Sequence, residues 1–85
     1  MSGKVYNRLR VLLAHKAEIE GRNISLKEVQ RETGIAWTSL QSWANNKVTR
    51  YDASVIEALC NYLNCDVGDL IVYRKEDENS ERNST

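Results

Sequence analysis

The segment "SLKEVQRETGIAWTSLQSWANN" (residues 25–46) predicts two short helices joined by a tight turn. Ser25 is followed three residues later by Glu28, which is the capping-box pattern at the start of a helix. Gly34 ends this helix after about eight residues, because glycine adopts the left-handed C-cap conformation without strain. A second helix is expected over residues 36–45, with two asparagines at its end. Such a pair of helices predicts a helix-turn-helix.

The second helix carries both tryptophans of the chain, six residues apart. At about 100° per residue, Trp43 falls on an apolar stripe with Ala36, Leu40 and Ala44, whereas Trp37 falls outside it. We therefore expect Trp43 in the core and Trp37 at its rim. The outward face of the helix presents hydrogen-bonding side chains without charge, namely Trp37, Thr38, Gln41 and Ser42, with Trp37 at its border.

This polar, uncharged face suits the major groove of DNA, where short side chains read base edges. No acidic residue occurs between Thr33 and Tyr51, a range in which a carboxylate would be repelled by phosphates. Residues 1–50 hold nine basic and four acidic residues, so they carry +5, and residues 51–85 carry −5. This asymmetry favours a polyanion-binding surface with an acidic end, and double-stranded DNA is the expected partner.

The other expected elements are helical too. Apolar residues recur at helical spacing from about Val5 to Ala17, and again after a cap at Asp52 or Ser54 up to Asn64. Asp66 is expected to cap a short fifth helix.

Residues 70–73, "LIVY", fit either an extended strand or the end of that fifth helix. The polar residues 74–85 are expected to be a disordered tail. The sequence thus predicts one domain over residues 1–73, followed by the tail.

Several classes of protein are disfavoured. The chain lacks an apolar run of about 18 residues, a signal-peptide pattern and a glycine-rich phosphate loop. One histidine and two cysteines make no credible metal set, and no serine lies in a nucleophile motif. Cys60 and Cys65 are expected to be small buried thiols rather than a disulfide. We expect no enzyme, no cofactor, no metal and no small-molecule ligand, and a cytoplasmic location at the nucleoid.

"ISLKEVQRETGIAWTSLQSWANNK" and the later "LNCDVGDL" resemble the Cro/CI-type, or lambda-repressor-like (XRE), helix-turn-helix family. The resemblance covers about residues 5–72. It implies an all-α, compact five-helix domain that binds operator DNA, often as a dimer, with its third helix in the major groove.

Position by position, the resemblance places base-reading roles on Trp37, Thr38, Gln41 and Ser42. It places contacts to the DNA backbone on Asn45, Lys47, Thr49 and Arg50 in the following loop, and on Ser25 and Lys27 at the start of the preceding helix. Three features depart from the family pattern: Leu26 stands where a glutamine is frequent, Ala36 replaces a Ser/Thr cap, and "AEIEGRN" lengthens the first connection.

The expected function is therefore a sequence-specific transcriptional regulator. One short reading face discriminates poorly against a genome, so we expect a homodimer that contacts itself through the fifth helix and residues 70–73. The alternative for Leu70 and Ile71 is that they close the core of the monomer. The alternative function is a protein-interaction module, such as the antitoxin of a toxin–antitoxin pair. For Trp37, base reading, backbone contact and support of the neighbouring helix all remain open.

Overall fold

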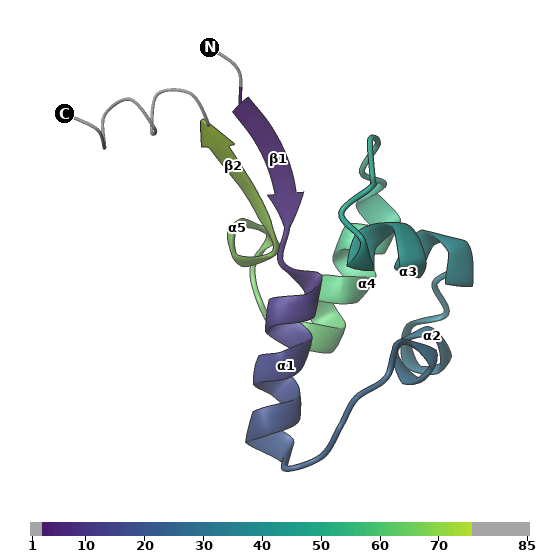
Figure 1. Cartoon of the computed structure of the whole chain (residues 1–85). Coiled ribbons are helices and arrows are strands. Elements are labelled where there is room, and N and C mark those ends of the chain that lie inside the picture. Colours follow the sequence, from purple (N-terminus) through teal and green to yellow (C-terminus); the bar gives the residue numbers. More distant parts are fainter. Residues whose placement is uncertain (1–2, 76–85) are drawn as a thin grey trace, which may run out of the picture.

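The computed structural model describes residues 3–75 as five helices and a two-stranded antiparallel sheet (Figure 1). The elements follow in the order β1 (Gly3–Asn7), α1 (Leu9–Glu20), α2 (Leu26–Thr33), α3 (Trp37–Ala44), α4 (Ala53–Leu63), α5 (Val67–Leu70) and β2 (Ile71–Lys75). The five-helix prediction is confirmed, with a small sheet added.

The core lies between α1, α2, α3 and α4, is closed by α5, and is built from large aliphatic residues and one tryptophan. Its members are Leu9, Leu13, Val29, Ile35, Leu40, Trp43, Leu59 and Leu70. The ring of Tyr51 meets Trp43 edge-on, with ring centroids 5.2 Å apart. Trp43 belongs to this core, as predicted, and its burial fixes which side of α3 faces outward.

The N-terminal helix was placed wrongly by the sequence pattern. Val5 does not open a helix; it lies in β1, opposite Tyr73 of β2, and α1 begins only at Leu9. The periodicity of Val5 with Leu9 is therefore accidental. β1 forms because residues 71–75 pair with residues 3–7, a partner about 65 residues away that no local pattern reveals.

The same pairing answers the question left open for residues 70–73. Leu70 ends α5 and is fully buried, and Ile71 begins β2. The segment therefore closes the core of the monomer and then leaves it as a strand. β2 extends to Lys75, two residues into the expected tail, and the remaining tail residues, 76–85, lie outside the described residues.

Helix boundaries follow local capping chemistry. Asp52, not Ser54, caps α4, since its carboxylate accepts the Ser54 N–H at 3.0 Å. Asp66 and Asp69 form a reciprocal capping box around α5.

Cys60 and Cys65 are free and half-buried, and burial raises the pKa of Cys65 to about 11.

Gly34 and Gly68 provide a matched pair for the role of the turn. Gly34 has φ +77°, so Gly34→Ala should lower the free energy of unfolding by roughly 1–2 kcal/mol. Gly68 lies in a helix with open space around it, so Gly68→Ala should leave stability unchanged or raise it by up to about 1 kcal/mol. Urea denaturation measures both, and equal effects would contradict the need for a left-handed residue at the turn.

Candidate nucleic-acid interface

The turn between α2 and α3 is fixed by one threonine hydroxyl. Thr33 Oγ1 donates to the Val29 carbonyl at 2.7 Å and accepts the N–H of Ile35 at 3.2 Å. Gly34 donates its own N–H to the Gln30 carbonyl at 2.8 Å from a left-handed conformation. Ile35 is only 7% exposed, so its side chain anchors the turn to the core. The turn thus holds α3 at a fixed angle to α2.

The start of α2 has the predicted cap in part. Ser25 Oγ accepts the Glu28 N–H at 3.2 Å, as expected. The Glu28 carboxylate does not return to the cap; it pairs with Arg22 at 2.7 Å, and this pairing lowers its pKa. Ser25 and Lys27 are both exposed at this end of α2.

The faces of α3 agree with the expected rotation of the helix. Leu40, Trp43 and Ala44 are buried at 0%, 3% and 6% exposure. Thr38 and Gln41 are exposed, whereas Trp37 and Ser42 are half-buried. Ala36 differs from the expected stripe: it is exposed, because it stands before the first turn as the N-cap and has no side chain to cap it.

Trp37 is in contact with the preceding helix. The Lys27 ammonium lies over its ring, 5.8 Å from the centroid. This distance is within the range of a cation–π interaction. The indole therefore bridges α2 and α3 at the rim of the core, next to the polar face of α3.

The C-terminal end of α3 is held by the start of the chain, through a contact that the sequence did not reveal. Asn7, 5% exposed, donates from Nδ2 to the Trp43 carbonyl at 2.9 Å. Arg10 Nε donates to the Ala44 carbonyl at 2.7 Å. These bonds satisfy carbonyls that a helix end leaves unpaired.

Asn46 completes this junction by pairing with the backbone of β1. Its Oδ1 accepts the Asn7 N–H at 2.8 Å, and its Nδ2 donates to the Asn7 carbonyl at 3.2 Å. Asn46 itself adopts φ +55°, and its neighbour Asn45 does not. The predicted left-handed asparagine is therefore the second of the two. Neither "YNR" nor "ANNK" carries a pattern that indicates this contact.

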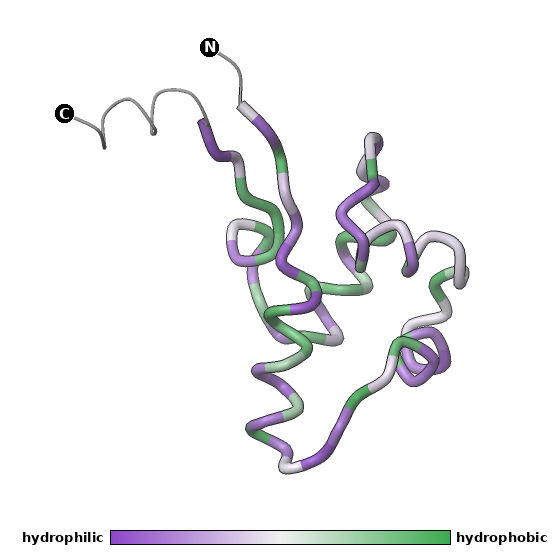
Figure 2. Tube along the Cα trace, in the orientation of Figure 1, coloured by the Kyte–Doolittle hydropathy of each residue, from purple (hydrophilic) through white to green (hydrophobic). Residues whose placement is uncertain are grey.

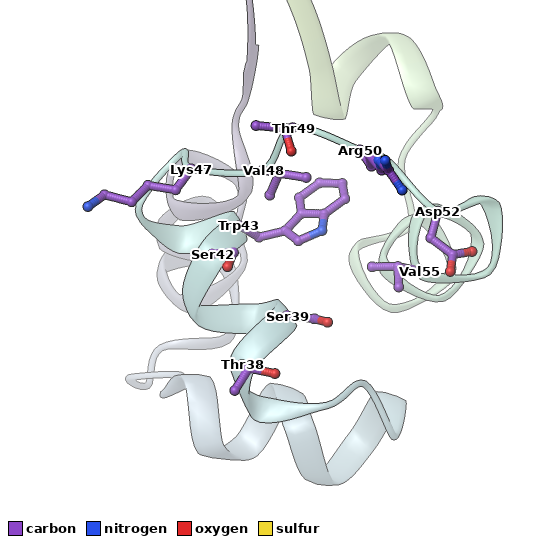
Figure 3. A pocket seen from close by; sticks show the side chains of 10 residues that line it. All are labelled: Thr38, Ser39, Ser42, Trp43, Lys47, Val48, Thr49, Arg50, Asp52 and Val55. Carbon is purple, nitrogen blue, oxygen red and sulfur yellow. The ribbon is translucent and has the colours of Figure 1, made fainter.

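The loop after α3 and the outer side of α3 enclose an open hollow of about 340 Å³ (Figure 3). Trp43 lies between the helix and the loop, and the Lys47 and Arg50 side chains point to opposite sides. Both cations are exposed, and within residues 3–75 neither has an ion pair with a carboxylate. The one acidic lining residue, Asp52, is engaged in capping α4. The structure thus gathers Thr38, Ser42, Lys47, Thr49 and Arg50 around one hollow.

Comparison with known proteins identifies this arrangement. The model of the Cro/C1-type HTH DNA-binding domain matches residues 8–76. The chain belongs to the Cro/C1-type helix-turn-helix DNA-binding family. It is therefore a helix-turn-helix transcriptional regulator, and this family acts by binding DNA rather than by catalysis.

Two similar proteins support this assignment. The chain is 32% identical over 57 residues to the uncharacterised HTH-type transcriptional regulator YozG of Bacillus subtilis (strain 168), a match that covers 67% of this chain and 68% of YozG. The crystal structure of the transcriptional regulator VanUg superposes with a TM-score of 0.65 at 27% identity, over 89% of this chain and 92% of that one.

Within residues 3–75, no group of three or more histidine, cysteine or acidic residues is placed to hold a metal ion. Over the same residues, every helix is too short or too polar to cross a membrane.

Asn46 and Asn64 test the junction between α3 and β1. Both have φ +55°, and glycine tolerates that conformation, so Asn→Gly removes only the side chain at each site. Asn46→Gly should lower the free energy of unfolding by about 1–3 kcal/mol, because part-buried groups of Asn7 lose their partners. Asn64→Gly should change it by less than about 0.5 kcal/mol or raise it. Chemical denaturation that finds the two variants alike would show that the Asn46 amide contributes nothing.

Proposed function

We propose that this Cro/C1-type regulator inserts α3 into the major groove of double-stranded DNA and reads a specific operator. The observation that carries the proposal is the exposed, uncharged side of α3, which lies opposite its buried residues Leu40, Trp43 and Ala44. Thr38 and Gln41 are the base-reading side chains, with Ser42 beside them at the hollow. A glutamine can bond adenine through two hydrogen bonds, and a threonine methyl suits thymine.

Trp37 is assigned to the edge of this reading face. Its contact with Lys27 favours support of α3 by α2, with the exposed part of the indole at the groove wall. The same contact places Lys27 on this surface, where with Ser25 it would reach a phosphate from the start of α2.

The loop after α3 is proposed to bind the DNA backbone. Lys47 and Arg50 lie on either side of the hollow and supply charge, while Asn45 and Thr49 are exposed donors. Phosphate contacts fix orientation and carry no sequence information directly. A regulator of this kind acts where its DNA is, which places its proposed location at the nucleoid in the cytoplasm.

Gln41→Ala and Lys47→Ala separate base reading from backbone contact. Gln41→Ala should cost about 1–3 kcal/mol of discrimination at one base pair and leave other positions unchanged. Lys47→Ala should weaken binding to all sequences alike and reduce the slope of log K against log salt by about 1. The measurement is selection from a random DNA pool, followed by titration of the selected duplex at several salt concentrations.

A uniform loss of affinity in both variants would contradict the assignment of Gln41. If the pool yields no enriched site at about 100 mM salt, specific regulation fails and the protein-interaction alternative is favoured.

We further propose that the regulator works as a homodimer through α5 and the sheet. Leu70 is buried in its own monomer and is not available for this contact. The apolar side chains exposed at this end are Val5, Val67 and Tyr73. The proposed interface is therefore made by these three residues rather than by Leu70 and Ile71.

Tyr73→Lys tests this interface, because it adds a charge to both copies without touching the core. Sedimentation equilibrium should show a dimer for the wild type and at least a tenfold weaker association for the variant. Val11→Lys on α1 is the matched control, since Val11 is equally exposed but lies outside the proposed interface. A wild-type monomer, or a dimer unaffected by Tyr73→Lys, would contradict the proposal.

A further inference from the structure

The two strands form a positively charged ribbon. Residues 3–7 and 71–75 contain Lys4, Arg74 and Lys75 and no acidic residue. Figure 2 shows β2 changing from hydrophobic at its base to hydrophilic at its tip. The cations of β2 therefore lie at its tip, away from the helices.

The register of the sheet separates two faces. Lys4 lies opposite Arg74, and Tyr6 opposite Val72, so these four residues share one face, which we call the basic ribbon face. Val5 and Tyr73 share the other face. A Cβ on Gly3 would overlap the Tyr73 ring, so this ring lies across Gly3 on that second face. Lys4 and Arg74 thus lie on the opposite face from the exposed apolar residues Val5 and Tyr73, whereas Lys75, which lies opposite Gly3, shares the face of Tyr73.

An aromatic ring orients one cation of the basic ribbon face, and no carboxylate of residues 3–75 neutralises it. The Arg74 guanidinium lies 5.4 Å from the centroid of the Tyr6 ring, a cation–π contact that orients it. Lys4 and Arg74 are both exposed, and within residues 3–75 no carboxylate pairs with either. Two cations on one face without a carboxylate partner among residues 3–75 attract a polyanion.

The ribbon starts at the loop that is proposed to contact the DNA backbone. Asn46 bonds the Asn7 backbone at the base of β1, and the next residue in the loop is Lys47. The ribbon and the loop between α3 and α4 extend from the helices toward the same end of the molecule (Figure 1). Lys4 is three residues beyond Asn7, roughly 10 Å along an extended strand. This distance spans roughly three base pairs of a duplex.

We propose that the basic ribbon face binds the sugar–phosphate backbone of DNA flanking the sequence that α3 reads. This inference rests on the proposed function and extends it with a second contact surface. Lys4 and Arg74 would each neutralise a phosphate, with Tyr6 holding the guanidinium in place. The contact would add affinity and orientation without base specificity.

The test compares the variant carrying Lys4→Gln and Arg74→Gln with the wild type on the selected duplex. Its slope of log K against log salt should fall by about 2, and its affinity at about 100 mM salt by on the order of tenfold for each lost contact. The selected sequence should stay the same. Hydroxyl-radical footprints should lose protection about three base pairs outside the base-read site. Lys16→Gln is the control, because Lys16 lies two turns along α1 and pairs with Glu20 at 2.9 Å.

The outcomes distinguish this inference from the proposed function. If the double variant keeps the wild-type slope and footprint while Lys47→Ala reduces the slope, the ribbon proposal fails and the proposed function stands. If the wild type itself selects no site, the proposed function fails. If the double variant keeps its slope and only aggregates or changes its oligomeric state, the charges protect strand edges or serve a second copy, and the proposal is overturned. Circular dichroism of each variant confirms that it is folded.

Discussion

One pair of asparagines holds the C-terminal end of α3 against the base of the sheet. The Asn46 side chain pairs with both backbone groups of Asn7, and the Asn7 side chain bonds the last turn of α3. A side-chain amide has one acceptor oxygen and two donor hydrogens, so it can bond a backbone N–H and a backbone carbonyl as a neighbouring strand would. The end of α3 and the base of the sheet are thus one hydrogen-bonded unit, and a shift of either would break bonds that are buried or part-buried.

Three surface regions with different side-chain chemistry surround this hydrogen-bonded unit. α3 offers uncharged hydrogen-bonding groups, the loop beyond it offers Lys47 and Arg50, and the ribbon offers Lys4 and Arg74. Uncharged groups read bases at short range, whereas cations attract phosphates over a longer range. The net charge of the chain is zero, so attraction to a polyanion depends on where the charges lie along the chain and not on their total.

Much of the candidate site was predictable because its signals are local. A cap at Ser25, a left-handed Gly34 and the rotation of α3 each involve residues within a few positions of one another. The burial of Trp43 and the half-burial of Trp37 follow from that rotation alone. The Lys27–Trp37 contact was less predictable, since it depends on the angle between two helices rather than on either of them.

The sequence by itself determined that there are five helices, where α2 and α3 lie and which side of α3 faces outward, because helical periodicity and capping act over a few residues. Only the tertiary structure decided that residues 3–7 are a strand, that Leu70 belongs to the core, and that Asn7 holds the end of α3. The physical reason is separation along the chain. A strand pairing across about 65 residues, or a side-chain hydrogen bond across 39, is specified by the packing of the whole domain, and no local sequence pattern indicates it.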